Sequence, residues 1–269
     1  MRTAERTLIL GAAGGFGRLL GALLEPASVL GVDLAPAPDA PYRVLPADAR
    51  ELVGAEDAAL RAADRVLVCL PEAVALPLLA PLAARLRPGA LLVDTLSVKA
   101  PVARALAGVR DEVELLSLNP LFAPRVGLAG ENVAAVTLRG GPRGAAFLAL
   151  LRGAGATIVP LDADEHDRAA AAVQVAAHAA ILAYAGALER LGPPPDGVST
   201  PPSRALAALV DRVLAGAPEV YRHVQADNPH SAAARAALAD ALAELGERVA
   251  SEDGFAALYA RLRAARRSA

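Results

Sequence analysis

The sequence contains very little cysteine and few aromatic side chains. Cys69 is its only cysteine, tryptophan is absent, and aromatic residues make up 3% of the 269 positions. A single cysteine excludes an intramolecular disulfide and a multi-cysteine zinc site. Because Cys69 lies in the apolar run RVLVCLP, we expect it to be a small buried side chain.

The sequence also lacks an excess of either charge. Its 27 basic and 29 acidic residues give a net charge of −2, and both signs are interspersed. A protein that binds nucleic acid usually carries a basic patch, so no nucleic-acid partner is expected. The four histidines and the single cysteine do not form a metal-binding motif, so no metal site is expected.

The chain has no apolar N-terminal run long enough for a signal peptide, because glycines begin at Gly11. One stretch, residues 169–188, carries no formal charge and is about as long as a bilayer span of ~20 residues. It is mostly alanine, however, with Gln174 and His178 near its middle. We therefore predict a buried central helix, no membrane partner and a cytoplasmic protein.

Apolar runs alternate with helical patterns in the first part of the chain, which is typical of a mostly parallel sheet covered by helices. The predicted strands are residues 6–11, 28–34, 65–71, 90–97, 113–120, 133–140 and 156–162. After Asp164 the patterns are helical. The sequence therefore predicts an α/β fold with a Rossmann-type dinucleotide-binding domain over residues 1–163 and an all-helical domain over residues 164–269.

A glycine-rich loop follows the first predicted strand. Gly11, Gly14 and Gly17 are spaced GxxGxxG and open a helix, which permits close approach of a pyrophosphate. Asp33 ends the next strand, where an acid binds a ribose 2′-hydroxyl and repels a 2′-phosphate, so NAD is expected rather than NADP. A glycine turn without a ligand is the alternative. The predicted cofactor residues here are Gly11, Gly14, Gly15, Phe16, Gly17 and Asp33.

Five further segments carry a family resemblance. They are CLP at residues 69–71, DTLSVK at 94–99, LNPLFAP at 118–124, EHDRAAAAVQVAAH at 165–178 and STPPSRALAALVDRVLAGAPEVY at 199–221. On these segments and the glycine loop, essentially the whole chain resembles the prephenate dehydrogenase family. The resemblance places Leu70 and Pro71 beside the cofactor, and implies a homodimer formed through the helical domain.

The resemblance implies NAD-dependent oxidative decarboxylation of a cyclohexadiene that carries two carboxylates. A dianionic substrate favours a guanidinium partner, and Arg212 matches the family's carboxylate-binding arginine, with Arg204 as a possible support. Ser97 matches the serine that hydrogen-bonds the group on ring carbon C4. Surface positions for both arginines and a capping role for the serine are the alternatives.

Other polar residues of these segments have less certain roles. Gln174 and His178 share a helix face, and we consider a place near the substrate and a structural role equally for His178. His166 lies in a matching motif without an assigned role. Lys99 could neutralise a phosphate or carboxylate, or be solvated.

Asn119 departs from the family pattern, which has a histidine at this position. That histidine draws a proton from the substrate's C4 hydroxyl, an effect worth ~10²–10⁴ in rate. An asparagine amide does not titrate. We favour a changed substrate, 4-amino-4-deoxyprephenate, which gives 4-aminophenylpyruvate. The alternatives are prephenate oxidised to 4-hydroxyphenylpyruvate with another base, such as His178 or water, and a catalytically idle relative that binds NAD.

Two other protein classes fit less well. Imine reductases and 6-phosphogluconate-dehydrogenase-type enzymes depend on a lysine or aspartate in the long helix, where this chain has only Gln174 and His178. A protein that serves only as an interaction module would not need the three loop glycines together with Asp33.

Overall fold

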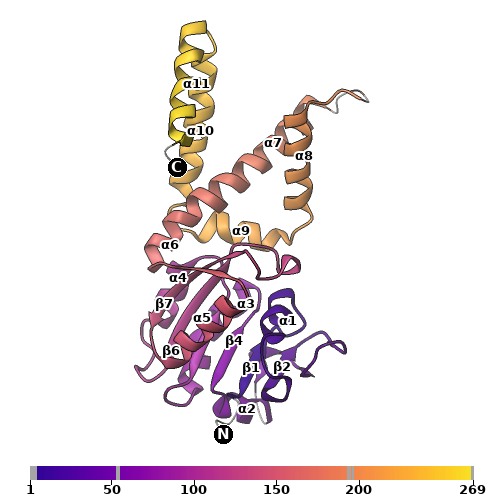
Figure 1. The fold of residues 1–269 in the computed structure, drawn as a ribbon, viewed down its shortest axis with the longest axis vertical. Helices are drawn as coiled ribbons and strands as arrows, with labels where there is room; N and C mark the ends of the chain where they lie inside the picture. Colours follow the sequence, from indigo (N-terminus) through magenta and orange to yellow (C-terminus); the bar gives the residue numbers. More distant parts are fainter. Residues whose placement is uncertain (1–4, 53–54, 193–194, 196, 268–269) are drawn as a thin grey trace. The chain divides into compact units, whose positions relative to one another are not determined.

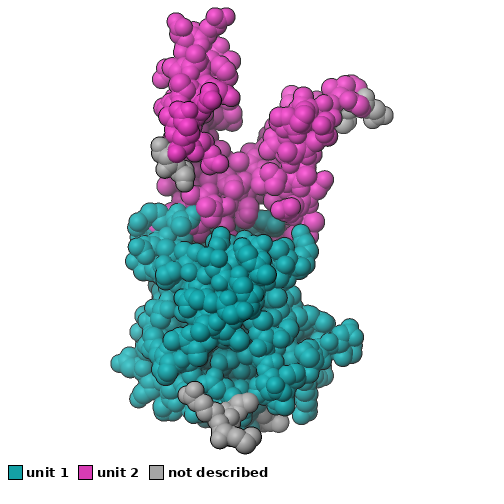
Figure 2. All heavy atoms as spheres, viewed as in Figure 1, with its two compact units in different colours: residues 1–169, 219–228 teal, residues 170–218, 229–269 magenta. Residues whose placement is uncertain are grey.

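The computed structural model describes residues 5–52, 55–192, 195 and 197–267, and these residues form two compact units (Figure 2). Unit 1 comprises Met1–Ala169 and Glu219–Asn228, and unit 2 comprises Ala170–Pro218 and Pro229–Ala269. The division differs from the expected boundary between residues 163 and 164. The start of the long helix and one later helix belong to unit 1.

Unit 1 contains an eight-stranded sheet of order β3-β2-β1-β4-β5-β6-β7-β8 (Figure 1). Neighbouring strands are parallel except for β6 and β7, which are antiparallel. The strands are β1 (Thr7–Leu10), β2 (Val29–Asp33), β3 (Arg43–Pro46), β4 (Arg65–Val68), β5 (Leu91–Asp94), β6 (Glu114–Pro120), β7 (Asn132–Arg139) and β8 (Thr157–Pro160). The seven predicted strands are confirmed, but β3 was not predicted, because it is a short, half-exposed edge strand with little apolar pattern.

Helices cover both faces of this sheet. One core contains Leu8, Val66 and Leu92 under α2, α3 and α4, and the other contains Ile9, Leu67 and the α5 residue Phe147 with α1. Alternate residues of each strand therefore face different cores, which explains the continuous apolar runs in the sequence. The helices are α1 (Gly15–Gly21), α2 (Ala55–Ala62), α3 (Glu72–Arg85), α4 (Lys99–Leu106) and α5 (Pro142–Gly153).

The strand order reverses at β1, which lies between β2 and β4. In open α/β sheets, ligands bind at such a switch point, outside the carboxyl ends of the strands. Because β1, β4, β5 and β6 are parallel, the glycine loop and the residues after β4 and β5 lie at the same edge of the sheet as Asn119 near the end of β6.

Unit 2 is helical. The long helix predicted over residues 165–192 consists of α6 (Ala163–Ala170), a π-helical segment η4 (Ala171–Ala176) and α7 (Ala177–Leu191), followed by α8 (Pro201–Leu214), α9 (Pro218–Asp227), α10 (Ser231–Arg248) and α11 (Glu252–Arg267). Within unit 2, α7 packs on α8, and α10 packs on α11 (Figure 1). The residues of α9 from Glu219 onward belong to unit 1.

The α7 part of the long helix is only partly covered by the described residues of the chain. The helix Ala163–Leu191 is long enough to span a membrane and contains an 18-residue window that is apolar enough to do so. That window has a mean hydropathy of 1.6, and 11% of it is buried among the described residues. Within the described chain α7 has no buried residue. The expectation of a buried helix is therefore wrong for the single chain, and this surface needs another cover.

Candidate active site

The three loop glycines differ in how closely other atoms approach them. Gly11 has a φ of 82° and a side chain there would place its Cβ 2.2 Å from the Cys69 carbonyl oxygen. A Cβ at Gly17 would lie 2.1 Å from the Gly11 oxygen, whereas one at Gly14 would meet that oxygen only at 3.2 Å. Gly11 and Gly17 are therefore required by backbone packing, whereas a side chain at Gly14 would meet the backbone less closely.

Asp33 is held beside this loop by two backbone donors. Its carboxylate accepts hydrogen bonds from Ala13 N at 2.8 Å and Ala35 N at 2.9 Å. Each carboxylate oxygen keeps a second lone pair for a ligand hydroxyl. The glycine loop and Asp33 together fit the pyrophosphate and ribose of NAD.

The glycine loop also packs on the segment that follows Asn119. Phe16 and Phe122 form an edge-to-face pair with ring centroids 6.0 Å apart, and a Cβ at Gly15 would lie 2.4 Å from Pro124 Cγ. On the other side, Leu70 packs near Gly11, and Pro71 is the N-cap of α3. The predicted cofactor residues thus lie together in unit 1.

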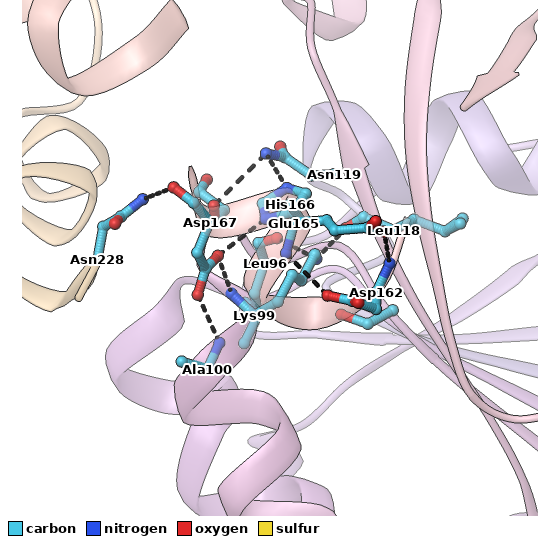
Figure 3. Close-up of polar contacts among 12 residues, drawn as sticks. Leu96, Lys99, Ala100, Leu118, Asn119, Asp162, Glu165, His166, Asp167 and Asn228 are labelled. Atoms are coloured by element: carbon cyan, nitrogen blue, oxygen red, sulfur yellow. Dashed lines mark hydrogen bonds and ion pairs between the residues drawn. The ribbon is translucent and has the colours of Figure 1, made fainter. Parts of the chain in front are cut away.

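Asn119 is 2% exposed and belongs to a chain of buried polar side chains (Figure 3). Its amide nitrogen Nδ2 lies 3.0 Å from His166 Nε2 and 3.4 Å from the Ser97 carbonyl oxygen. On the other side of the imidazole, His166 Nδ1 lies 2.8 Å from Asp167 Oδ1. Asn119 and Ser97, predicted from distant motifs, are therefore neighbours, and His166 lies beside them.

Asp167 supplies the cap that α4 lacks locally. The helix has no side-chain cap at Val98, and Asp167 accepts hydrogen bonds from Lys99 N at 2.8 Å and Ala100 N at 2.7 Å (Figure 3). Both belong to the first turn, whose N–H groups have no partner within the helix. Asn228 Nδ2 donates to the Asp167 backbone oxygen at 2.8 Å, so the end of α9 is held to the same point.

Lys99 is fully buried, so neither expectation for it, a solvated side chain or a ligand partner, is correct. Its ammonium donates to Leu96 O at 2.5 Å and Leu118 O at 2.8 Å, and lies 3.7 Å from Asp94 Oδ1. Asp94 also accepts a hydrogen bond from Ser117 Oγ at 2.8 Å. Burial lowers the pKa of Lys99 and raises that of Asp94. The Asp94–Lys99 ion pair therefore links the end of β5 to the end of β6, next to Asn119.

Glu72 was not predicted. It is the first residue of α3, directly after Pro71, and its Oε1 atom is buried without a hydrogen-bond partner among the described residues. Burial raises the pKa of Glu72 to about 7, opposed by the charge of His223 and reinforced by that of Asp227. The sequence did offer a signal for Glu72, because this glutamate directly follows the predicted strand that ends at Pro71.

The remaining predicted residues belong to unit 2. Arg204 and Arg212 are exposed on α8, and Arg204 Nη1 donates to Ser199 Oγ at 3.1 Å. Gln174 lies in the π-helical segment, and His178 is partly buried on α7, where burial lowers its pKa. Their assignment to the substrate stays a prediction.

His166 and Asp167 are the main residues whose roles sequence reasoning missed. The EHD motif at residues 165–167 was noted, but the pattern alone did not connect it with Asn119, which is 47 residues away from His166. Because both side chains are buried, their partners could be found only from the fold.

Two family models match the sequence. The prephenate dehydrogenase nucleotide-binding domain matches residues 46–135, and the prephenate dehydrogenase dimerization domain matches residues 162–262. A 4-amino-4-deoxyprephenate dehydrogenase from Streptomyces pristinaespiralis is 41% identical over 266 residues, which cover 96% of this chain and 90% of the relative.

Solved structures share the fold. A prephenate dehydrogenase from Aquifex aeolicus in complex with hydroxyphenyl propionate and NAD+ has a TM-score of 0.70 at 16% identity, covering 99% of this chain and 98% of that one. An arogenate dehydrogenase from Synechocystis has a TM-score of 0.64 at 14% identity, covering 98% and 99%. At these identities the likeness concerns the fold.

Two substitutions in the glycine loop should have different effects, one on stability and the other on NAD binding. Gly17→Ala should destabilise the protein by about 1–3 kcal/mol, because its Cβ meets backbone. Gly14→Ala should keep most of the stability and weaken NAD binding by about tenfold, because its Cβ fills the space for the phosphate. Thermal unfolding and NAD titration measure the two effects. Equal loss of stability in both variants would contradict this division.

Glu72 generates a prediction about pH. Its pKa is raised from 4.5 to about 7 in the folded state, so the native protein binds a proton that the unfolded chain releases, and stability falls as pH rises through this window. The substitution Glu72→Gln removes this decrease of stability with rising pH, because glutamine does not titrate. Its Tm should exceed that of the wild type by about 2–4 °C near pH 8 and approach it near pH 5.

The matched control is Glu247→Gln, at an exposed position of α10. A Tm difference between Glu72→Gln and the wild type that is the same at both pH values would show that Glu72 does not cause the pH dependence.

Proposed function

The chain belongs to the prephenate dehydrogenase family of NAD-dependent oxidoreductases, and on this basis we propose that it converts 4-amino-4-deoxyprephenate to 4-aminophenylpyruvate. The 41% identical relative that carries the name of this activity supports the choice of substrate. The observation that carries the proposal is the chemistry of Asn119, which cannot take up a proton at the position where the family has a base.

An amine at C4 removes the need for that base. As the C4–H electron pair leaves as hydride, the nitrogen lone pair forms a carbon–nitrogen double bond and gives a stabilised iminium. Loss of carbon dioxide from C1 then returns an electron pair to the ring, which becomes aromatic and restores a neutral amine. A C4 hydroxyl is a weaker electron donor, so its oxidation depends much more on removal of the O–H proton.

The residues around Asn119 suit a neutral amine. The Asn119 carbonyl oxygen accepts one N–H hydrogen bond, and the Ser97 hydroxyl, on the residue whose carbonyl contacts Asn119, accepts the second. NAD would supply the acceptor for the hydride. The residues that would hold it are Gly11, Gly14, Gly15, Phe16, Gly17, Asp33, Leu70 and Pro71.

The family resemblance also assigns substrate-binding residues within the helical unit. Arg212 binds a substrate carboxylate as a bidentate partner, and Arg204, two turns earlier on α8, supports it. Gln174 and His178, on the long helix, are assigned to the substrate by the resemblance, and a structural role is the alternative for His178. Burial lowers the pKa of His178, which favours a neutral imidazole that can accept a hydrogen bond.

The alternative substrate is prephenate, oxidised to 4-hydroxyphenylpyruvate with His178 or water as the base. This alternative requires a base other than Asn119 to reach the C4 hydroxyl. It predicts substantial turnover of prephenate by the unaltered enzyme, which the amino-substrate proposal does not.

Measuring NAD reduction with both substrates tests the proposal. We expect the wild type to prefer 4-amino-4-deoxyprephenate, and Asn119→His to gain prephenate activity by about 10²-fold, because a titrating base is restored. Asn132→His, at an exposed asparagine on β7, is the matched control and should not gain it. A wild-type preference for prephenate would refute the amino-substrate assignment.

We also propose a homodimer formed through the helical unit. Apolar side chains of α8, α10 and α11 are exposed in the single chain, among them Leu214 at 64%, Leu242 at 69% and Tyr259 at 64%, and α7 has no buried residue. A second copy would cover this surface, in agreement with the dimerization-domain match. An apolar helix covered in this way needs no membrane, and we place the enzyme in the cytoplasm.

Light scattering with size-exclusion chromatography tests the dimer. We expect a dimer at micromolar concentration, and the double variant Tyr259→Glu, Leu262→Glu on α11 should shift it toward monomer, because two charges would be buried in an apolar interface. Val126→Glu, at an exposed apolar residue of unit 1, is the control. A monomeric wild type would refute the proposal.

A further inference from the structure

We infer that Arg18 is a second determinant of cofactor choice, because it offers a guanidinium to a phosphate on the 2′-oxygen of the adenosine ribose. The charge of Asp33 keeps this latent phosphate site from accepting NADP. Arg18 is not among the cofactor residues predicted from the sequence. The inference goes beyond the proposed function, because it concerns the cofactor and not the substrate.

The guanidinium of Arg18 is attached to the glycine loop, beside Asp33. Its Nε donates to the Ala13 carbonyl oxygen at 2.9 Å, and the N–H of Ala13 donates to Asp33 Oδ2 at 2.8 Å. Because both groups are anchored on one residue, Nε lies within roughly 10 Å of the Asp33 carboxylate. Tyr42 OH donates to Gly17 O at 3.1 Å, so the chain between β2 and β3 also packs against the turn of α1 that carries Arg18.

Most of the donors of this guanidinium remain available to a ligand. Arg18 is exposed, and within the described part of the chain its side chain forms one hydrogen bond, from Nε to Ala13, and no ion pair. The N–H groups on Nη1 and Nη2 therefore face solvent. A guanidinium binds a phosphate through such planar pairs of N–H groups.

The segment that follows Asp33 brings no other cation to this place. Between Arg18 and Arg43 the sequence contains no basic residue. Arg43 pairs in register with Leu30, near the start of β2, whereas Asp33, at the end of β2, pairs with Pro46. Arg43 therefore lies toward the opposite end of the strand, and Arg18 is the cation of this stretch that lies beside Asp33.

Asp33 opposes the use of Arg18 as a phosphate site. A phosphate monoester carries a charge of about −1.5 to −2 at neutral pH, which the carboxylate repels, whereas the 2′-hydroxyl of NAD can donate a hydrogen bond to it. Two donors, Ala13 N and Ala35 N, hold the carboxylate in place. The other carboxylate of this segment, Asp39, is exposed, so water and salt screen its charge. The preference for NAD therefore depends on one charge.

Calorimetric titration with NAD and with NADP, in the absence of any substrate, tests the inference. Asp33→Asn should bind NADP about tenfold more tightly than the wild type does, because the repulsion is removed. Adding Arg18→Ala to Asp33→Asn should weaken NADP binding by about tenfold and so cancel this gain. The same addition should change the Kd for NAD by less than about twofold, because NAD has no 2′-phosphate for Arg18 to bind.

The matched control is Arg43→Ala in the Asp33→Asn background, which removes an exposed arginine from the same unit. It should leave the Kd for NADP within about twofold. The inference would be overturned if Asp33→Asn gained no affinity for NADP. It would also be overturned if Arg18→Ala weakened NAD and NADP by the same factor, because Arg18 would then only support the loop through Ala13.

Salt dependence tests the phosphate contact without a change at position 18. In Asp33→Asn, the Kd for NADP should rise more steeply with added salt than the Kd for NAD, because a charge contact at an exposed residue is screened. Equal salt dependence for the two cofactors would overturn the inference even if Arg18→Ala failed to fold.

The inference and the proposed function fail in different ways. None of these titrations contains a substrate, so a wild-type preference for prephenate over the amino substrate would leave them unaffected. A wild type that bound NADP more tightly than NAD would refute the role given to Asp33, and with it the latent site at Arg18, without bearing on the group at C4.

Discussion

The buried carboxylate of Asp167 is the constraint on which the candidate site depends. A carboxylate removed from water is costly unless it is hydrogen-bonded, and Asp167, at 0% exposure, has three donors in Lys99 N, Ala100 N and His166 Nδ1. Two of them begin α4 and the third continues to Asn119. A single side chain on α6 thereby caps the start of a helix after β5 and is linked through His166 to an amide on β6.

A second buried charge stabilises the same edge of the sheet. Breaking a buried ion pair by removing one partner typically costs about 3–5 kcal/mol, so the Asp94–Lys99 pair tolerates little change. The Lys99 ammonium also binds Leu96 O and Leu118 O, which holds the chain just before Ser97 and just before Asn119. One lysine thus holds the chain next to both residues proposed to contact the C4 group.

How far the sequence predicts this molecule depends on whether a feature is local. The apolar runs, the GxxGxxG loop and Asp33 are local patterns; the apolar runs predicted the mostly parallel sheet correctly, and the proposed cofactor residues lie together in unit 1. β3 has too few apolar residues to be recognised, and the π-helical segment at Gln174 leaves no sign in an alanine-rich run. Lys99 was expected to be solvated or to face a ligand because its acceptors are backbone oxygens, those of Leu96 and of Leu118 on β6, which no sequence pattern reveals. The link between His166 and Asn119 spans 47 residues, and only the packing of α6 against β6 creates it.

The His166–Asp167 pair has the geometry of a catalytic dyad, but Asn119 changes what the pair can do. In a dyad, the Nε2 atom faces the group that loses a proton. Here the atom next to His166 Nε2 is the Asn119 amide nitrogen. The hydrogens of an amide are not acidic enough to be transferred at neutral pH, so Asn119 does not relay a proton to the imidazole. In the proposed site, one non-titrating group would therefore separate the imidazole from the substrate. A polar network of this kind suits a substrate whose own lone pair, and not a protein base, drives the loss of hydride.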